Sequence, residues 1–249
     1  MVRELVSRAW DSPAAELYER VRPTYPQSAI AFVVAELGID ESSELVDLAA
    51  GTGKLTRSLL HIGARVTAIE PLDGMRSVLA RELPEVTAMA GSAEEIPLED
   101  ESVDAIFVGQ AFHWFDREKA PREIARVLRP GGGLVPIWNT REEREGWIGE
   151  IREIIERYKR DAPQHEDDEW RTGVDDSGLF EPVQQRDFEQ VQEVPRAQAV
   201  EVFASRSYVS ALPAEERKRA LEEIAAVIPD RETITIPYTT EVYWTRRSE

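Results

Sequence analysis

The stretch that decides the fold is Leu45-Val46-Asp47-Leu48-Ala49-Ala50-Gly51-Thr52-Gly53-Lys54-Leu55-Thr56. It starts as an apolar run with an acid, continues through small residues, and then shows apolar residues at helical spacing from Leu55 onward. This order predicts a strand, a tight turn and a helix. Because glycine has no Cβ and adopts positive φ, such a turn can approach a ligand closely, and the N–H groups that begin the helix point toward that ligand.

A second acid, Glu70, follows the apolar run Val66-Thr67-Ala68-Ile69. At the end of the second strand of a βαβ unit, a carboxylate is placed to accept hydrogen bonds from ribose hydroxyls. Strand, glycine turn, helix, strand and acid together predict a half-fold that binds a nucleoside. A glycine turn alone also occurs as a purely structural feature, so the rest of the chain has to indicate which nucleoside cofactor is bound.

Composition limits the class of partner. The 249 residues have a formal net charge of −18, and 42% of them are hydrophobic. This is enough for one large α/β domain with an insertion or for two small domains. Duplex nucleic acid and anionic membranes attract clustered Lys and Arg. The charge therefore argues against both partners, although a local basic groove is compatible with an acidic total.

The chain has no cysteine, which excludes disulfides, thiol nucleophiles and thiolate metal sites. The three histidines, His61, His113 and His165, lie far apart and lack metal-ligand spacing, so no metal is expected. The first residues lack the apolar core of a signal peptide, and no run reaches the ~20 apolar residues of a membrane span. These features predict a soluble, cytoplasmic protein.

Apolar runs and helical patterns alternate regularly through the first half of the chain. We expect strands at 44–48, 65–70, 86–90, 103–108 and 134–138, and helices at 53–61, 71–81 and 118–128. Repeated alternation with apolar, β-branched strands implies a parallel sheet with both faces covered. The run Pro130-Gly131-Gly132-Gly133 is expected to end the helix before the fifth strand.

The flanking segments complete the predicted organisation. Helices are expected at 16–22, 27–37, 142–160, 196–208 and 213–228, a loop or short insertion at 161–178, and strands at 183–191 and 233–244. No repeat or composition shift requires a second domain. We therefore predict a single domain over 1–249, made of N-terminal helices (1–43), a cofactor-binding core (44–140), a helical cover or substrate region with one strand (141–230) and a C-terminal strand (231–249).

A set of motifs covers about residues 44–138. They are Asp47-Leu48-Ala49-Ala50-Gly51-Thr52-Gly53, Glu70, Gly91-Ser92-Ala93-Glu94-Glu95-Ile96-Pro97-Leu98, Ser102-Val103-Asp104-Ala105-Ile106 and Arg126-Val127-Leu128-Arg129-Pro130-Gly131-Gly132. Together they resemble the class I S-adenosylmethionine-dependent methyltransferases, in the small-molecule branch (methyltransferase type 11) that is similar to the ubiquinone and menaquinone biosynthesis enzymes. The resemblance implies a Rossmann-like α/β fold: a mostly parallel seven-stranded sheet with helices on both faces, an antiparallel last strand and helical cover elements.

Two further motifs narrow the resemblance. Tyr18-Glu19-Arg20-Val21-Arg22-Pro23-Thr24-Tyr25-Pro26 and Phe112-His113-Trp114-Phe115 look like the trans-aconitate-methyltransferase-like subgroup. The sequence also departs from the family pattern. Ala49 stands where Gly is usual, Ala50 where Cys or Gly is common, and Ser92 where Asp often receives the adenine amino group. A Ser hydroxyl accepts that bond more weakly, and the added methyl groups matter only where backbone and cofactor are in very close contact.

The resemblance implies a role for each part of the S-adenosylmethionine site. Glu70 would accept from the ribose hydroxyls, and Asp47 would lie near the ammonium group. Arg22 would pair with the carboxylate, or is only a surface charge. The other implied contacts are the backbone of Ala49, Gly51, Gly53, Gly109 and Gln110 with the methionine part, Pro71 and Leu72 with the adenine face, and Ser92 and Ala93 with the adenine edge.

The acceptor is expected beside His113 and Trp114, which follow the fourth strand, and beside Tyr18. His113 is the candidate general base. Alternatively, Phe112, Trp114 and Phe115 only pack, and His113 is part of that scaffold. The implied reaction is in-line displacement of methyl from sulfonium by an O, N or C nucleophile, which leaves S-adenosylhomocysteine. A carboxylate acceptor needs no base, whereas an amine or phenol can need one.

Other classes remain as alternatives. A nicotinamide-dependent oxidoreductase would be expected to show Gly-x-Gly-x-x-Gly, and the third glycine is missing here. A non-catalytic S-adenosylmethionine-binding protein could keep the same fold, because fold does not fix function. A nucleic-acid methyltransferase is disfavoured by the charge and by the lack of an Asn/Asp-Pro-Pro-aromatic motif. We expect a small-molecule acceptor, no nucleic-acid or membrane partner, and a monomer or homodimer.

Overall fold

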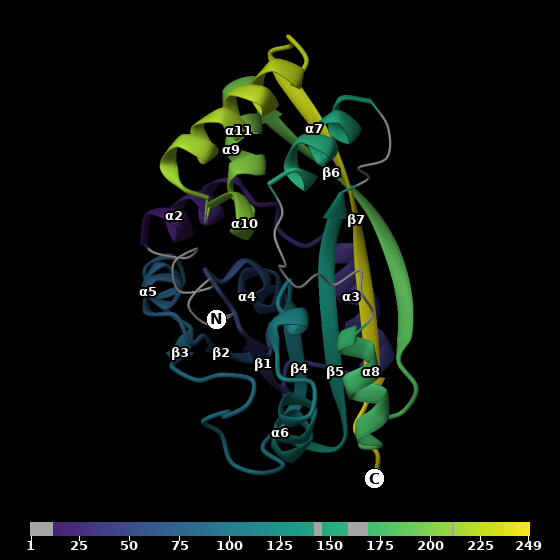
Figure 1. The fold of residues 1–249 in the computed structure, drawn as a ribbon. Helices are drawn as coiled ribbons and strands as arrows, with labels where there is room; N and C mark the ends of the chain where they lie inside the picture. The colour runs from purple at the N-terminus through teal and green to yellow at the C-terminus, as the bar shows by residue number, and fades with distance from the viewer. Residues whose placement is uncertain (1–11, 142–145, 159–168, 211) are drawn as a thin grey trace. The chain divides into compact units, whose positions relative to one another are not determined.

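The computed structural model describes residues 12–141, 146–158, 169–210 and 212–249 (Figure 1). The chain forms two compact units. The smaller unit contains Met1–Pro23, Thr140–Ala162 and Glu189–Thr239. The larger unit contains Thr24–Asn139, Pro163–Phe188 and Thr240–Glu249.

The strands form one seven-stranded sheet in the order β3-β2-β1-β4-β5-β7-β6. They are β1 (Glu44–Leu48), β2 (Arg65–Ile69), β3 (Thr87–Met89), β4 (Val103–Gly109), β5 (Leu128–Arg141), β6 (Gln184–Pro195) and β7 (Thr233–Arg246). The pairs β1–β2, β2–β3, β1–β4 and β4–β5 are parallel. The last strand, β7, runs antiparallel to β5 (Figure 1). The predicted α/β, mostly parallel seven-stranded sheet is therefore confirmed.

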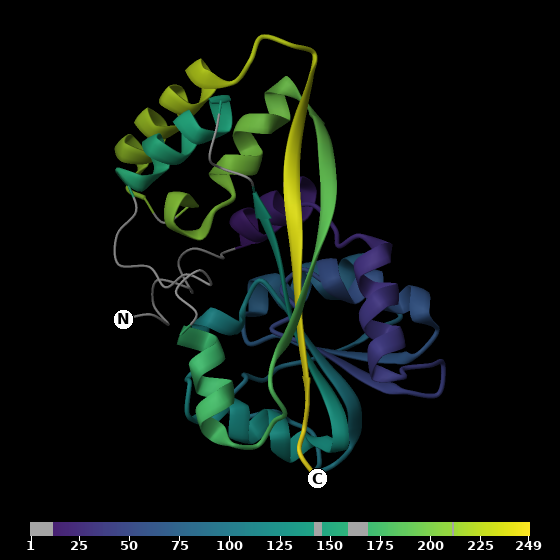
Figure 2. The same cartoon turned by 90° about the vertical axis from the view of Figure 1, so that its right-hand side faces the viewer.

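Helices cover both faces of the sheet in the larger unit. One face, with Val46 and Val108, packs against α6 (Lys119–Val127) and α8 (Glu169–Ser177). The opposite face, with Leu45 and Phe107, packs against α3 (Gln27–Leu37) and α4 (Lys54–Leu59). The quarter-turn view shows α3 in purple and α8 in green on opposite sides of the strands (Figure 2). The two layers follow from the alternation of side chains along each strand.

The remaining helix of the larger unit, α5 (Asp73–Glu82), lies between β2 and β3 in the sequence, as expected. The helix predicted at 53–61 is α4 followed by a 3₁₀ turn, η1 (Leu60–Ile62). The prediction that Pro130-Gly131-Gly132-Gly133 separates helix and strand is wrong, because β5 begins at Leu128 and includes this run. Glycine suits this run, since a Cβ on Gly132 would lie 2.8 Å from the backbone oxygen of Arg129.

The prediction of a loop or short insertion at 161–178 is also wrong where the structure describes it, because α8 spans Glu169–Ser177. Trp170 and Val174, four positions apart, are buried against the sheet. The acidic residues of the segment hide this short apolar stripe in the sequence. The helix predicted at 142–160 is α7 (Gly146–Glu156), and residues 142–145 and 159–168 lie outside the described ranges.

The smaller unit has its own apolar core. The helices of this unit are α2 (Ser12–Val21), α7, α9 (Arg196–Ala204), α10 (Ser207–Ser210) and α11 (Ala214–Val227). In this core, Ile151 and Ile155 of α7 pack with Phe203 and Ile224. The helix predicted at 196–208 ends at Ala204 instead. None of the helices in the described ranges is long and apolar enough to cross a membrane.

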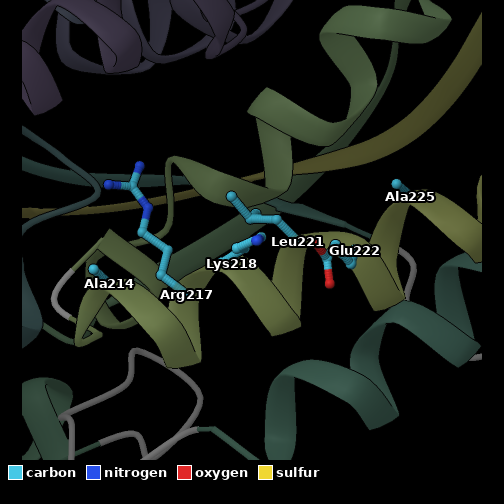
Figure 3. Close-up of a pocket in the computed structure, with 6 residues that line it drawn as sticks. All are labelled: Ala214, Arg217, Lys218, Leu221, Glu222 and Ala225. Atoms are coloured by element: carbon cyan, nitrogen blue, oxygen red, sulfur yellow. The ribbon is translucent and has the colours of Figure 1, made fainter.

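A cavity of about 520 Å³ lies along α11 in the smaller unit (Figure 3). Its lining residues recur at helical spacing along one stripe of this helix. They are Ala214, Arg217, Lys218, Leu221, Glu222 and Ala225. The stripe combines apolar and charged side chains, and Figure 3 shows the Arg217 guanidinium extending away from the helix axis.

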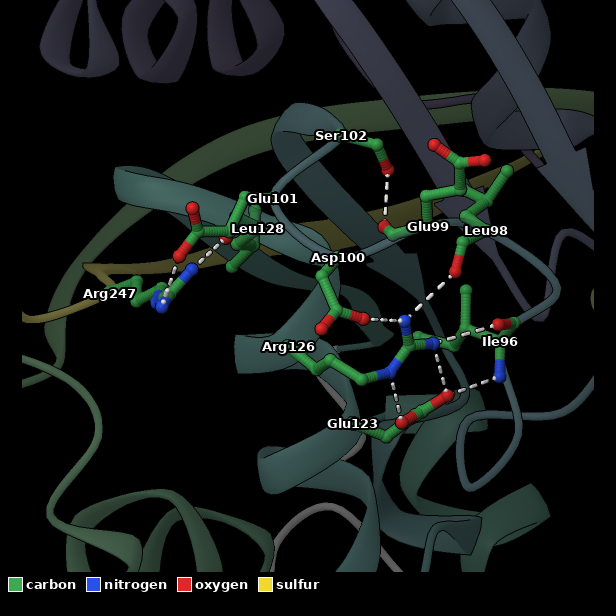
Figure 4. A network of polar contacts seen from close by, with 10 residues as sticks. All are labelled: Ile96, Leu98, Glu99, Asp100, Glu101, Ser102, Glu123, Arg126, Leu128 and Arg247. Atoms are coloured by element: carbon green, nitrogen blue, oxygen red, sulfur yellow. Dashed lines mark hydrogen bonds and ion pairs between the residues drawn. The ribbon is translucent and has the colours of Figure 1, made fainter.

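In the larger unit, Arg126 on α6 joins the helix to the loop that precedes β4 (Figure 4). Its guanidinium donates to both oxygens of Glu123, to Asp100 Oδ1 at 2.6 Å, and to the carbonyl oxygens of Ile96 and Leu98 at 3.0 and 2.9 Å. The bonds that Arg126 donates to the Glu123 carboxylate lower the pKa of Glu123. The loop therefore depends on the planar fork of one arginine.

Replacing Arg126 by Lys is expected to lower the free energy of unfolding by about 2 kcal/mol, because an ammonium group cannot satisfy this set of acceptors. Urea unfolding measures the loss. The matched control is Arg129→Lys, which changes one half-exposed ion pair with Asp104 and should cost less than about 1 kcal/mol. If both variants lost the same free energy of unfolding, the Arg126 network would contribute no more to stability than a single exposed ion pair.

Candidate cofactor and acceptor site

The sheet order reverses between β1 and β4, whose residues pair from Leu45–Ala105 to Asp47–Phe107. In an open parallel sheet, ligands bind beyond the carboxyl ends of the strands at such a switch point. The turns that follow β1 and β4 therefore start at the same edge. Most of the predicted cofactor residues lie in these turns or in those after β2 and β3.

The turn after β1 has an unusual backbone. Ala49, Gly51 and Gly53 all have positive φ, at 58°, 58° and 89°. The turn is held by bonds from the Ala50 N–H to the Ile69 oxygen (3.1 Å) and from the Gly53 N–H to the Ala50 oxygen (2.9 Å). A left-handed conformation is disfavoured for alanine, and strain of this kind is concentrated at functional sites.

Glu70 connects the turn after β1 with the turn after β2. Its side chain is buried, Oε2 accepts from the Gly51 N–H, and Oε1 accepts from the Leu72 N–H, both at 2.8 Å. Arg76 donates to the backbone oxygen of Glu70 at 2.7 Å. Burial raises the pKa of Glu70, and the two N–H donors oppose this shift. Since each carboxylate oxygen has two lone pairs, both can still accept another bond.

Asp47 is fully buried on the face of β1 that α4 covers. Its Oδ2 accepts from Thr56 Oγ1 at 2.5 Å, whereas its Oδ1 has no hydrogen-bond partner in the described residues. Burial raises the pKa of Asp47 to about 7. Thr52 Oγ1 is also buried and unpartnered. Burying a polar atom without a hydrogen-bond partner costs folding free energy. Asp47 Oδ1 and Thr52 Oγ1 are therefore candidates for hydrogen bonds to a ligand.

The turns after β2 and β3 start side by side, because the Glu70 N–H donates to the Met89 oxygen at 3.0 Å. Pro71 is exposed and Leu72 half-buried at the start of α5. Beyond β3, Ser92 exchanges backbone bonds with Glu95, and Ala93 is buried. The structure thus places Pro71, Leu72, Ser92 and Ala93 beyond paired strand ends, and their predicted contacts with adenine stay predictions.

Gly109 is the last residue of β4, and Gln110 follows it. Gln110 has a φ of 59°, and its N–H donates to the Ile137 oxygen at 2.9 Å. Its side chain donates to the backbone oxygen of Asn139 at 3.2 Å. A Cβ on Gly109 would lie 2.6 Å from the Tyr25 hydroxyl, so a larger residue here would require the Tyr25 side chain to shift. The end of β4 is therefore bonded to β5 and packs closely against the segment before α3.

His113 and Trp114 lie in the 3₁₀ turn η2 (Phe112–Trp114), and their ring centroids are 5.2 Å apart. The Nε1–H of Trp138 donates to Nδ1 of His113 at 3.4 Å. Phe112 is buried against Trp170. His113 and Trp114 are therefore half-buried, while the buried Phe112 side chain fixes the turn to the core.

Tyr18 and Arg22 belong to the smaller unit, at the end of α2 and just after it. The Arg22 guanidinium lies over the Tyr18 ring at 5.4 Å and donates to the Ser205 oxygen at 3.2 Å. Their predicted roles toward cofactor carboxylate and acceptor stay predictions. In the described ranges, no group of three His, Asp or Glu residues could hold a metal ion.

Several supporting residues were missed by the sequence analysis, among them Thr56, Arg76, Tyr25, Asn139 and Trp138. Thr56 had a usable signal, since a hydroxyl on the buried side of a short apolar helix needs a partner. The other residues act through contacts that no local pattern shows.

The comparisons with known proteins agree with this geometry. The family described as "Methyltransferase domain" matches residues 46–135. An uncharacterized methyltransferase of Mycobacterium tuberculosis is 41% identical over 86% of this chain and 84% of its own length. An uncharacterized methyltransferase of Schizosaccharomyces pombe is 32% identical over 95% of this chain and 98% of its own. This chain therefore belongs to the class I methyltransferase family.

A solved structure shares the fold at much lower identity. It is phosphoethanolamine N-methyltransferase 2 of Haemonchus contortus, in complex with phosphomonomethylethanolamine and S-adenosylhomocysteine. The TM-score is 0.61 at 14% identity, over 100% of this chain and 60% of that one. The resemblance to class I methyltransferases drawn from the motifs is confirmed at the level of family and fold.

Proposed function

We propose that this protein transfers a methyl group from S-adenosylmethionine to a small-molecule acceptor. The observation that carries the proposal is the pair of buried acids at the switch point, Asp47 and Glu70, beside a turn with positive φ. When bound, S-adenosylmethionine supplies a methyl group on a positively charged sulfonium. The family supports this cofactor, and the related Haemonchus enzyme was solved with S-adenosylhomocysteine.

The acids fit the charges of this cofactor. Glu70 is held by the Gly51 and Leu72 N–H groups with lone pairs left to accept from ribose hydroxyls. Asp47 has one buried oxygen without a hydrogen-bond partner among the residues that the structure describes, and this oxygen suits an ammonium group as donor. A dinucleotide would place its anionic pyrophosphate at this glycine turn, next to the buried carboxyl of Asp47. Asp47 therefore disfavours a nicotinamide cofactor, whereas Glu70 suits the ribose of either cofactor.

The chain's contribution to the reaction is alignment. The turns after β1 and β4 are fixed by backbone bonds and by close packing at Gly109, so they hold a bound molecule in one place. Holding two reactants in an in-line geometry and excluding water is a proximity effect that can supply much of the rate enhancement. His113 and Trp114 at the end of η2 form one wall of the proposed acceptor pocket.

Calorimetric titration with S-adenosylmethionine, S-adenosylhomocysteine and NADH tests the cofactor. We expect micromolar binding of the first two and none of NADH. A methyl-transfer assay on a panel of small acids, amines and phenols then tests turnover. The cofactor assignment would be overturned if the protein bound NADH, or if it bound neither S-adenosylmethionine nor S-adenosylhomocysteine. Binding without turnover on any acceptor would favour a non-catalytic S-adenosylmethionine-binding protein.

A further inference from the structure

Trp138 is a fully buried ring of the larger unit and lies directly beside His113. It has no exposed surface, and its ring centroid is 4.9 Å from that of Trp170 and 5.6 Å from that of Tyr243. Trp170 and Tyr243 are themselves 4.9 Å apart. This packing fixes the direction of the Trp138 Nε1–H, which is aimed at His113 Nδ1.

A buried indole N–H needs an acceptor, because leaving it without one costs on the order of 1–3 kcal/mol. The acceptor in this structure is the Nδ1 atom of His113, at 3.4 Å. A ring nitrogen that accepts carries no proton, so the neutral imidazole has its proton on Nε2. The bond made by one nitrogen thus decides what the other can do.

We propose that Trp138 is a positioning residue that holds His113 as the Nε2–H tautomer, so that His113 donates a hydrogen bond to the methyl acceptor instead of taking its proton. The placement of the acceptor beside His113 rests on the proposed function, whereas the tautomer does not. The only basic lone pair of the neutral ring, on Nδ1, faces the immobile indole. His113 therefore orients the acceptor through an oxygen or nitrogen lone pair.

This assignment defines the class of acceptor chemistry. The atom that is methylated carries no removable proton at the working pH. Its lone pair forms the bond to the methyl carbon, the carbon–sulfur bond breaks, and the electron pair of that bond stays on sulfur as a neutral thioether. No proton is transferred to His113, so the step balances without a base.

The first test measures the tautomer directly. Long-range ¹H–¹⁵N NMR spectra of the ligand-free protein, at a pH where the rings are neutral, distinguish protonated from unprotonated ring nitrogens. The chain has three histidines, and His113→Gln identifies the His113 signals. We expect a protonated Nε2 and an unprotonated Nδ1. A protonated Nδ1 in the wild-type protein would overturn the proposal.

A matched pair of variants tests whether the indole N–H of Trp138 determines the tautomer of His113. Trp138→Phe removes the indole N–H, whereas Trp170→Phe makes the same change in the neighbouring ring of this buried aromatic cluster. We expect His113 to become a mixture of tautomers only in Trp138→Phe. Near-ultraviolet circular dichroism checks that both variants are folded. An unchanged His113 spectrum in folded Trp138→Phe, or equal changes in both variants, would contradict the role of Trp138.

The second test separates donor from base once an acceptor is known. Glutamine can donate from a similar position but cannot act as a base at neutral pH. His113→Gln should keep more than about a tenth of kcat, whereas His113→Ala should lose clearly more. A loss of about 10²–10⁴-fold in both variants is the result expected for a general base and would overturn the donor role. If no methyl transfer is found at all, the proposed function fails while the NMR result stands by itself.

Discussion

Replacing Asp47 by Asn is expected to weaken S-adenosylmethionine binding by more than about a hundredfold at pH 7.5, because removing one partner of a buried ion pair typically costs several kcal/mol. Asp47 offers a buried Oδ1 without a partner, and its Oδ2 is fixed by Thr56. Asparagine cannot provide the charge. Calorimetric titration of the purified variant gives the dissociation constant.

The pH dependence of binding gives the same prediction a second readout. Burial raises the pKa of Asp47 to about 7, so the ligand-free carboxyl is protonated below this pH. A cationic partner prefers the ionised form, and affinity should therefore fall by up to about tenfold per pH unit from pH 7 to 5.5. The Asp47→Asn variant should lose this dependence. Asp176→Asn, at an exposed carboxyl on α8, is the matched control.

Stability of the ligand-free protein checks this pKa independently. The folded-state value is raised from 3.8 to about 7, so between these values the folded protein binds a proton that the unfolded chain has lost. The contribution of Asp47 is therefore fully present below about pH 4 and is lost as the pH rises through 7. Urea unfolding should show wild-type stability falling relative to Asp47→Asn from pH 5.5 to 8. The raised pKa of Asp47 and its role in cofactor binding would be contradicted if the wild type and Asp47→Asn showed the same pH dependence of stability and the same affinity for the cofactor.

Replacing Glu70 by Ala is expected to weaken S-adenosylhomocysteine binding by more than about tenfold, the loss of two charge-assisted hydrogen bonds from ribose. The same change leaves the Gly51 and Leu72 N–H groups without their acceptor, so it also loosens the turn. A loss of affinity alone would not distinguish the lost ribose bonds from the loosened turn. The experiment therefore needs a ligand that cannot form all of the ribose bonds to Glu70.

Such a ligand is 2′-deoxy-S-adenosylhomocysteine, which forms a thermodynamic cycle with Glu70→Ala. The variant should lose much less affinity for the deoxy compound than for the parent. The exposed Glu85→Ala is the matched control and should bind both ligands as the wild type does. Equal losses for the two ligands would mean that Glu70 only supports the turn, and the ribose role would be withdrawn.

Local patterns predicted most of the fold. The strands from β1 to β4 and α3 to α6 were located to within a few residues, because apolar runs alternate with helical spacing and Gly or Pro separates them. The prediction failed at α8, where only Trp170 and Val174 carry the apolar stripe. Burial of so short a stripe depends on the sheet face beneath it, and this face is built from distant strands.

The sequence by itself determined the family and the position of Asp47, the glycine turn and Glu70 along the chain, since these are properties of short segments. The seven-stranded sheet was expected only because the resemblance to the family implies it. Only the tertiary structure decided how these groups are held: Thr56 on Asp47, Arg76 on the Glu70 backbone and Trp138 on His113. Hydrogen bonds depend on distance and direction within a few tenths of an ångström, and the packing of both sheet faces sets these after the chain has folded.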